Sequence, residues 1–522
     1  MRPESRSARS YLQVDKIMKT VEKWLTIKMK SCCALEKAAI SSRMSQLIVS
    51  QLRTPFLRMN IGGHIDEKIG LAGKLPQKLY CGQMEINIET GSVKPSVKLL
   101  ILSIMKFIAL WLLSFAYFFR SLVMNKSESG PATLIYGVPY ANLTTDGSAQ
   151  LFEDFCQKGS LNVLSNAKKI IVQVNRPVKA GNSQSFVYAR FPLFALFLAN
   201  KLNMNDSLVF MKQHVSIFFR YIYMMLKCPI TCLLWQDFAV HAVVVALNNK
   251  KLIEANIITN TNWLKQLLWM TDLSNRHFKT YMALYSQNNS SMIFKDDPVT
   301  AVYPGITNLR ADLIWIWDAF YEEVLKQQGV FIKTRVVAPV LWYLPIINTA
   351  QKNTELRRIC VFDVSPMSKE HLLDNGFSGS YYNTETMVSY MKDILVVVDN
   401  LKKQLRCEIE VILKHKRVST EAHDATYFSH VNELCESNSN LRLVAENSNL
   451  FTLITGSELV IVAPFSSPAY VANYFNIPAL FYDPTNEILV SNEIVSPIIF
   501  VSGRENLTIE IANILERKVD LV

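Results

Sequence analysis

The sequence predicts an α/β protein in which two facing domains, each a Rossmann-like parallel sheet with helices, follow a helical, partly membrane-associated extension. After Arg358, apolar runs of strand length alternate regularly with helical windows. A similar order of strand, turn and helix begins at Ala132, and before it Leu99 to Phe119 is an almost unbroken apolar run. We therefore expect an extension in residues 1–95, a hydrophobic membrane-associated helix in 96–126, and α/β domains in 131–345 and 355–522.

Length and composition restrict the class of protein. The chain has 522 residues, 50% of them hydrophobic, with 27 Phe, 20 Tyr and 8 Trp. This excludes a largely disordered chain and is enough for two or three separate cores. The formal net charge is +11, but the basic residues are spread along the chain, so no nucleic-acid-binding arm is expected. A diffuse positive charge suits anionic lipid or phosphorylated substrates.

Cysteine usage and the chain start point to a cytoplasmic protein. The nine cysteines include no Cys-x-x-Cys pair and no His-rich companion, which favours reduced thiols and predicts no metal site or other cofactor. An Asp-x-Asp pair in a convincing strand-end loop is also missing from the sequence. The first residues carry basic side chains without an apolar core of signal-peptide length, so secretion is not indicated.

The run from Leu99 to Phe119 is broken only by Lys106 and has about the length that a helix needs to cross a bilayer. At about 100° per residue, however, Lys98, Lys106 and Arg120 fall within roughly 80° of one another, on one face of the helix. This favours a helix lying in the interface with its basic side on anionic headgroups. A spanning helix and a buried core helix are the alternatives.

A second apolar region runs from Ser207 to Leu234. It is interrupted by Lys212, His214, Arg220 and Lys227, which makes spanning costly. We expect a buried helix or a membrane-facing rim.

The remaining elements follow from local pattern. In the extension we expect helices near Val21 to Leu35 and Ala38 to Leu52. In the first α/β domain we expect a strand from Ala132, a helix capped by Ser148 and a strand over Lys168 to Val174. The rest of this domain, from Phe191 to Lys326, is predicted to be helix-rich, with Trp263, Trp269, Trp315 and Trp317 expected in its core. In the second domain we expect strands in RICVFDV, EIEVILK, NLRLVA, ELVIVA, IPALFYD and PIIFVS, and helices over Thr384–Leu405, Asp424–Glu436, Ser448–Thr455, Pro468–Phe475 and Glu505–Arg517.

Three strand ends of the second domain carry polar groups suited to a nucleoside diphosphate. They are Asp363 in VFDVSP, the KHKR cluster with Lys414, Lys416 and Arg417, and PFSSP with Ser466 and Ser467. In a doubly wound parallel sheet, ligands bind beyond the carboxyl ends of the strands, so these groups should lie at one edge of the sheet.

PFSSP and KHKR each have a structural and a functional interpretation. Ser466 or Ser467 at a helix start can cap the helix, and Pro468 suits its first turn, so the free N–H groups and hydroxyls would form a phosphate seat. An ordinary Ser-capped helix has the same pattern. The KHKR cations would attract a diphosphate, whereas a solvated basic turn is the alternative.

The run ELVIVAPFSSPAYVANYFNIPALFYDP resembles the signature of the bacterial polysaccharide biosynthesis proteins named for a Pro-Phe-Thr-Ser motif. VFDVSP and KHKR resemble that family's Phe-Asp-Val-Thr-Pro strand end and Lys-x-Lys-Arg cluster, and Ser466 replaces the motif's Thr, which keeps the hydroxyl. The resemblance extends over roughly Ala132 to Val501 and is specific in the last third. Such proteins are similar to the two-domain nucleotide-sugar glycosyltransferases of the GT-B type.

The resemblance implies transfer of a sugar from a nucleotide-sugar donor to a lipid-linked or membrane glycan acceptor, on the cytoplasmic face of the inner membrane. An inverting transfer would need a general base from the first domain. Asp146 is the candidate, with His241 and Asp237 in WQDFAVH in reserve; a turn-forming Asp and a structural His are the bland alternatives. A non-catalytic polysaccharide-assembly or sugar-nucleotide-binding scaffold and a CDP-alditol phosphotransferase-like enzyme remain alternative functions.

Overall fold

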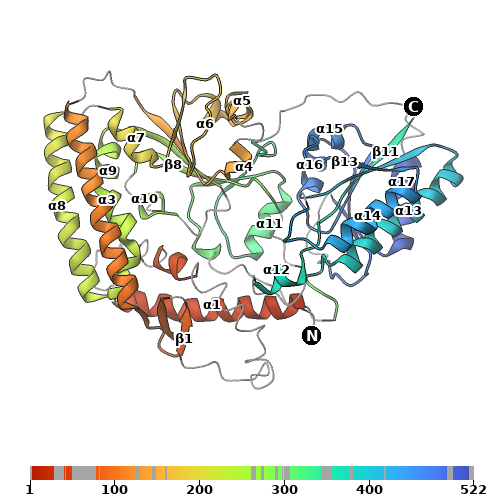
Figure 1. Cartoon of the computed structure of the whole chain (residues 1–522), viewed down its shortest axis with the longest axis horizontal. Helices are drawn as coiled ribbons and strands as arrows, with labels where there is room; N and C mark the ends of the chain where they lie inside the picture. Colours follow the sequence, from red (N-terminus) through yellow and green to blue (C-terminus); the bar gives the residue numbers. More distant parts are fainter. Residues whose placement is uncertain are drawn as a thin grey trace.

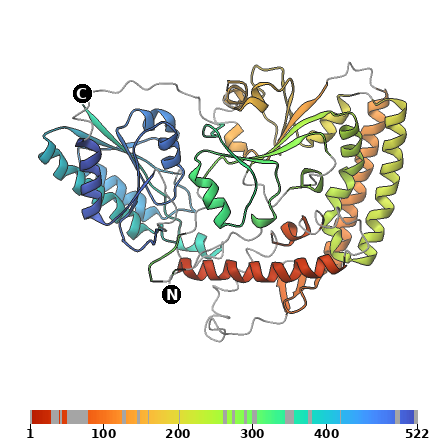
Figure 2. The same cartoon turned by 180° about the vertical axis from the view of Figure 1, so that it is seen from behind.

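The structure is a computed structural model. It describes residues 3–28, 40, 43–49, 78–81, 83–123, 130–143, 148–158, 161–200, 202–259, 266–271, 276–287, 292–296, 298, 306–342, 356–374, 380–416, 419–490 and 498–516. Within these ranges the chain forms two parallel sheets, a small antiparallel sheet and a layer of long helices (Figures 1 and 2).

The N-terminal α/β domain contains a seven-stranded sheet with the order β10-β9-β8-β7-β4-β5-β6. Every pair in it is parallel. Numbered within the sheet, this is a doubly wound order whose direction reverses between β4 and β7. The strands are β4 (Ala132–Tyr136), β5 (Ile170–Gln173), β6 (Phe186–Ala189), β7 (Ile253–Thr259), β8 (Lys279–Ala283), β9 (Leu313–Ile316) and β10 (Thr334–Val336).

The C-terminal α/β domain contains a six-stranded sheet with the order β13-β12-β11-β14-β15-β16, again wholly parallel. This is the 3-2-1-4-5-6 order of the Rossmann fold, with its switch point between β11 and β14. The strands are β11 (Arg357–Phe362), β12 (Ile409–Lys414), β13 (Leu441–Val444), β14 (Leu459–Val462), β15 (Ala479–Asp483) and β16 (Ile499–Ser502). Its helices are α12 (Lys369–Asp374), α13 (Thr384–Leu405), α14 (Ala425–Ser437), α15 (Leu450–Thr455), α16 (Pro468–Tyr474) and α17 (Arg504–Glu516).

Long helices form one end of the molecule, and the six-stranded sheet lies at the other (Figures 1 and 2). The long helices are α3 (Val97–Val123), α8 (Met204–Lys227) and α9 (Trp235–Asn249). Helix α1 (Pro3–Lys28) begins near the C-terminal domain and runs along the edge of the molecule to this end. The shorter elements are β1 (Lys78–Cys81), β2 (Met84–Asn87), β3 (Val93–Pro95), α4 (Tyr140–Leu143), α5 (Gln150–Lys158), α6 (Asn162–Ser165), α7 (Pro192–Leu198), the 3-10 turns Pro229–Leu234 and Ile306–Asn308, α10 (Leu268–Thr271) and α11 (Phe320–Gln327).

The predicted fold class is confirmed, and the elements of the C-terminal domain agree closely with the expected ones. The N-terminal domain differs, because the expected helix-rich stretch from Phe191 to Lys326 also contains β7, β8 and β9. Trp269, Trp315 and Trp317 are buried, as expected, although Trp315 belongs to a strand; Trp263 lies outside the described residues. The extension begins with a longer helix than predicted, since α1 starts at Pro3.

Helices α3 and α8 pack through an aromatic seam that contains a buried histidine. The His214 ring stacks on Trp111 at 4.4 Å between centroids and on Phe115 at 5.3 Å. Its Nδ1 lies 3.4 Å from the Ser114 hydroxyl. No described residue makes a hydrogen bond to its Nε2. Burial lowers the pKa of His214 to about 4, so the folded protein favours the neutral imidazole.

This histidine should make the helical layer sensitive to acid. In the unfolded chain, His214 has its ordinary pKa near 6.5. Between pH 6.5 and 4 the unfolded chain therefore binds a proton that the folded protein does not. The contribution of His214 to the free energy of unfolding is complete above about pH 6.5 and is lost as the pH falls towards 4. We expect His214→Phe to gain thermal stability relative to the unaltered protein over this range. Melting temperatures of both proteins at pH 4 to 7.5 test this. A difference that does not change with pH would contradict the assignment.

Candidate functional site

The candidate site lies at the switch point of the C-terminal sheet. Strands β11 and β14 are neighbours, and Phe362 at the end of β11 is in register with Val462 at the end of β14. The chain continues from β11 into Asp363 and Ser365, and from β14 into PFSSP. Two of the three polar strand ends predicted from the sequence therefore flank the crevice where doubly wound sheets bind ligands. The third, at Lys414, ends β12, the other neighbour of β11.

Asp363 is a fully buried carboxylate that binds the segments around the end of β11. Its Oδ2 lies 2.5 Å from His415 Nδ1 and accepts a hydrogen bond from the Tyr427 hydroxyl at 2.7 Å. Its Oδ1 accepts from the backbone N–H of Lys416 at 2.8 Å. Burial and then the neighbouring carboxylate raise the pKa of Tyr427, which keeps the phenol protonated as a donor. Asp363 therefore positions the segment after β12.

The basic cluster does not act as a single solvated turn. The Lys414 ammonium donates to the Glu446 carbonyl at 2.5 Å, and burial lowers the pKa of this half-buried side chain. His415 points inward to Asp363 and is 4% exposed. Lys416 is exposed, and Arg417 lies outside the described residues. Lys414 is in register with Phe362 at the end of β11, and the backbone of Lys416 is held next to that end by Asp363.

PFSSP forms a strained turn between β14 and α16. Phe465 has φ of 58°, a left-handed conformation that is rare for a bulky side chain and often marks functional loops. The turn is held by the Tyr382 hydroxyl, which donates to the Pro464 carbonyl at 2.5 Å. Ser466 is 2% exposed, and its hydroxyl has no hydrogen-bond partner within the described chain.

The expected cap of α16 is wrong in one respect. Pro468 occupies the first turn as predicted, but the N-cap residue Ser467 makes no side-chain cap bond. Its hydroxyl instead accepts from the backbone N–H of Gln287 at 3.2 Å, across to the N-terminal domain. Because α16 has only seven residues, its macrodipole attracts an anion only weakly. The groups that remain to bind a phosphate here are the hydroxyls and the cations.

A second buried hydroxyl lies at the same switch point. Ser365, which follows β11, is 5% exposed, and its hydroxyl forms no hydrogen bond to the rest of the described structure. A buried polar group without a partner costs about 1–3 kcal/mol, so such groups are rare and call for an explanation. Ser365 and Ser466 are two of the sixteen such atoms among the described residues, and they are candidates for ligand contacts because they follow adjacent parallel strands at the switch point.

The two α/β domains meet through residues that the sequence analysis did not identify. Asn473 of α16 donates to the Asp318 carboxylate at the carboxyl end of β9. Phe294 and Ile488 form an antiparallel bridge, flanked by a bond from the Lys295 ammonium to the Asn486 side chain at 2.8 Å. The loop that carries Asn486 and Ile488 is organised by Asp483, which accepts from the backbone N–H groups of Glu487 and Ile488, each at 2.9 Å. The Tyr-Asp-Pro ending of the motif marks this loop in the sequence. The residues that the loop contacts, Phe294 and Lys295, are about 190 positions away, so local sequence could not identify them.

Of the predicted catalytic residues that the structure describes, neither His241 nor Asp237 lies at this crevice. Asp146 lies outside the described residues. His241 lines a cavity of about 270 Å³ whose walls come from Ile40, α8, α9 and the segment around α10, with none from the C-terminal domain. Asp237 lines the same cavity, where it accepts from the Leu268 N–H at 2.7 Å and lies 3.5 Å from Arg43 Nε. Burial raises the pKa of Asp237, and its partners give it an anchoring role.

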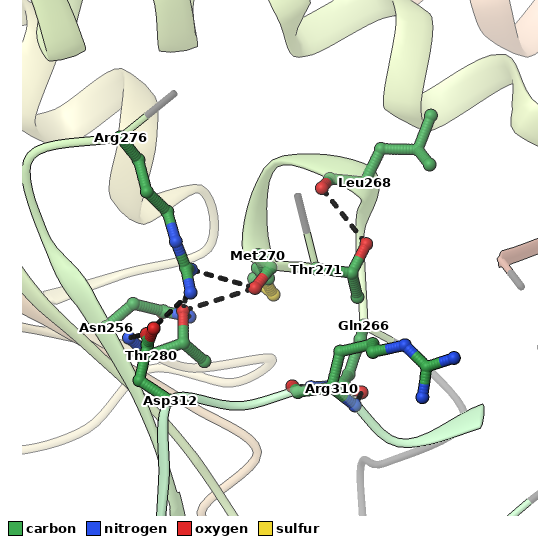
Figure 3. A network of polar contacts seen from close by, with 9 residues as sticks. All are labelled: Asn256, Gln266, Leu268, Met270, Thr271, Arg276, Thr280, Arg310 and Asp312. Carbon is green, nitrogen blue, oxygen red and sulfur yellow. Dashed lines mark hydrogen bonds and ion pairs between the residues drawn. The ribbon is translucent and has the colours of Figure 1, made fainter. Parts of the chain in front are cut away.

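Arg276, which lines that cavity, belongs to a polar network (Figure 3). The Arg276 guanidinium lies 2.5 Å from the Asp312 carboxylate and donates to the Met270 carbonyl at 2.9 Å. The same carboxylate accepts from the Thr280 N–H at 2.6 Å. Since Thr280 is in β8 and Asp312 precedes β9, the network fixes α10 against the starts of these strands, away from the carboxyl edge that faces PFSSP.

The chain is therefore a two-domain α/β protein, in which two doubly wound domains are joined near the carboxyl ends of their strands. The sequence profile of the polysaccharide biosynthesis PFTS motif proteins matches residues 219–510. Because this is more than half of the chain, the chain belongs to that family. None of the curated proteins compared with it matches.

Several solved structures are similar to the chain. The wall teichoic acid polymerase TagF has 10% identity and a TM-score of 0.37, covering 80% of this chain and 89% of that one. The trehalose-6-phosphate structure from E. coli bound with UDP-2-fluoro glucose has 11% identity and a TM-score of 0.35, covering 75% and 92%. Sucrose-phosphate synthase from Thermosynechococcus elongatus has 12% identity and a TM-score of 0.35, covering 74% and 90%.

Proposed function

We propose that the chain is a glycosyltransferase of bacterial surface polysaccharide biosynthesis, which binds a nucleotide-sugar donor at the switch point between β11 and β14. The observation that carries this proposal is the pair of buried, unpartnered hydroxyls of Ser365 and Ser466 at that point. A donor diphosphate has oxygens for both hydroxyls. Family membership supports the polysaccharide pathway.

The chemistry assigned to the site is displacement of the nucleotide. The acceptor hydroxyl attacks the anomeric carbon of the donor sugar, the bond to the nucleotide oxygen breaks, and negative charge develops on the leaving phosphate. Groups that point at developing charge in a buried site contribute most to catalysis. We assign this role to the Ser466 hydroxyl, assisted by the ammonium groups of Lys414 and Lys416. Asp146 remains the proposed base for the acceptor proton, with His241 in reserve. His241 could take this role only for an acceptor bound in the cavity of α8, α9 and α10, because the structure places it there and not at the crevice.

The acceptor is proposed to be a lipid-linked or membrane glycan on the cytoplasmic face of the inner membrane. This is supported by α3, which has a mean hydropathy of 2.3 in its most apolar window, and only 22% of that window is buried in the protein. Among the described residues, a second segment of sufficient length and apolarity, Pro229–Asn249, is 72% buried in its window, as in a core helix. An anionic membrane surface suits the net charge of +11.

Incubating the full-length protein with a panel of nucleotide sugars and measuring nucleotide release tests the function. We expect turnover of one donor class, increased by a membrane fraction that supplies acceptor. Calorimetry with the same donors gives a separate reading of binding. Binding without turnover would identify a scaffold, and selective use of CDP-glycerol or CDP-ribitol would identify an alditol phosphotransferase; both results contradict sugar transfer.

A further inference from the structure

Helices α3 and α8 each have one apolar side that no described part of the protein covers. On α3, Val97, Ile101, Met105, Leu112 and Phe119 are 51% to 72% exposed. On α8, exposed fractions of 53% to 76% are found for Leu208, Phe219, Tyr223 and Leu226. So many exposed large apolar side chains on two neighbouring helices are uncommon on soluble proteins and mark an interaction site. We call these exposed sides together the two-helix surface.

The two helices lie side by side and form one unit. Phe107 of α3 packs on Tyr221 of α8 with ring centroids 4.1 Å apart, and Phe118 of α3 packs on Phe210 of α8 at 4.6 Å. The Trp111 indole donates to the His214 carbonyl at 3.0 Å. Figures 1 and 2 show both helices together at the end of the molecule remote from the six-stranded sheet. Along each helix, the exposed apolar residues occupy positions between the buried ones, so they lie on the side of the helix away from the seam.

The packing of α3 is incompatible with crossing a bilayer in this structure. Its buried residues extend from Ser103 to Ser121, along most of the helix. The Lys106 ammonium lies over the ring of Trp235, the first residue of α9, at 5.8 Å. Helix α9 leads directly into β7 in the middle of the seven-stranded sheet. A transverse α3 would carry this α/β layer into the hydrocarbon core, so α3 in this packing can meet a membrane only along its surface.

The charges on the two-helix surface select the occupant. Helix α3 contains no acidic residue, and its Lys98 and Arg120 are exposed. Helix α8 exposes Lys212 and Lys227, while its one acidic residue, Asp206, lies 3.5 Å from Lys250. A second copy of this chain would bring like charges together, whereas anionic headgroups complement them.

We propose that the two-helix surface docks the protein on an anionic bilayer, with α3 and α8 both lying in the plane of the interface. This deepens the proposed function by naming the surface that meets the acceptor's membrane. It places the N-terminal domain next to the bilayer and the nucleotide-binding domain farther from it. Apolar side chains enter the headgroup boundary, and the cations contact lipid phosphates.

Flotation of the full-length protein with vesicles tests the docking. We expect binding to phosphatidylcholine vesicles containing phosphatidylglycerol and little binding to phosphatidylcholine alone. Changing Lys98, Arg120 and Lys212 to Gln should weaken binding on the order of 100-fold, since each cation near the surface contributes about 1 kcal/mol. Changing Ile101, Leu112 and Phe219 to Gln should weaken it at least about tenfold. Equal binding of both lipids, or wild-type binding by either variant, would overturn the proposal.

Matched controls separate the surface from general effects. Lys369, Lys392 and Lys403 are exposed cations of the C-terminal domain, and their change to Gln should leave vesicle binding unchanged. Phe331, which is 82% exposed outside the two helices, gives the apolar control as Phe331→Gln. Light scattering without lipid must show the same oligomeric state for all variants. A dimer that the Ile101, Leu112 and Phe219 changes dissociate would assign the surface to a second copy.

Topology distinguishes docking from spanning. Val97 and Val123 lie at opposite ends of α3 and are 72% and 83% exposed. In the variants Val97→Cys and Val123→Cys, an impermeant maleimide outside the vesicles should label both ends, as read by peptide mass spectrometry; protection of one end alone would indicate a spanning helix. Nucleotide release in lipid-free solution should be equal in all docking variants. Its absence throughout would reject the proposed activity and leave the docking result standing.

Discussion

Replacing Ser466 by alanine should lower the rate of donor turnover by about 100-fold or more while leaving the protein as stable as before or slightly more stable. The rate falls because a hydrogen bond to the charge that develops in the transition state is lost, an effect of about 10²–10³ in mutated enzymes. Stability does not fall because the hydroxyl is buried without a partner in the described structure, and removing it relieves a desolvation cost. Steady-state kinetics and urea unfolding on the same preparations measure both effects.

Two further substitutions sharpen this test. Ser466→Thr restores the hydroxyl and should recover much of the rate. Ser467→Ala removes the acceptor for the Gln287 N–H and should cost about 1 kcal/mol of stability. This variant should therefore lose stability more than rate, whereas Ser466→Ala should lose rate and keep its stability. Wild-type turnover in Ser466→Ala would remove this hydroxyl from the mechanism.

Replacing Asp363 by alanine should destabilise the C-terminal domain by about 3–5 kcal/mol, the range found when one member of a buried charged network is removed. The substitution leaves the Tyr427 hydroxyl, the His415 imidazole and the Lys416 N–H without the acceptor that they share. Tyr427 and His415 are themselves buried, so water cannot replace the carboxylate at low cost. Urea unfolding followed by circular dichroism measures the loss.

A graded series identifies the cause. Asp363→Asn keeps one acceptor oxygen and should cost less than alanine, and Tyr427→Phe removes a single donor and should cost about 1 kcal/mol. Asp399→Ala is a matched control, because this carboxylate accepts from the Asn440 side chain at a partly buried position. If Asp363→Ala unfolds at the same urea concentration as the unaltered protein, the organising role is wrong.

Local sequence pattern was sufficient for the C-terminal domain. Strands buried on both faces of a parallel sheet appear as continuous apolar runs, and β11, β14 and β15 are such runs bounded by polar turns. Asn383 caps α13 through a bond to the Thr386 N–H, so the helix begins where the pattern placed it. Local pattern also put Asp363, Lys414 and PFSSP at strand ends, because a strand's end is visible in its own residues.

The strands β7 to β9 were not recognised because their local signals conflict. Strand β7 contains Glu254 and Asn256, and β9 has only the four residues LIWI, whose aromatic ring also suits a helix core. Their state depends on pairing in the sheet, which joins Asn256 to Thr280 and Met282 to Ile314. Backbone hydrogen bonds between distant segments outweigh local propensity in such short strands.

Tertiary packing decided what each polar group does. Ser466 and Ser467 are equivalent in sequence, yet one is buried without a partner among the described residues and the other binds Gln287, 180 positions away. Asp363 was predicted as a ligand contact, and the structure adds that the segment after β12 and helix α14 surround it with hydrogen-bonding partners. The apolar sides of α3 and α8 have the composition of core helices, and only their packing on α9 left those sides uncovered. Composition and spacing determine which elements form, whereas burial and long-range hydrogen bonds depend on which elements meet.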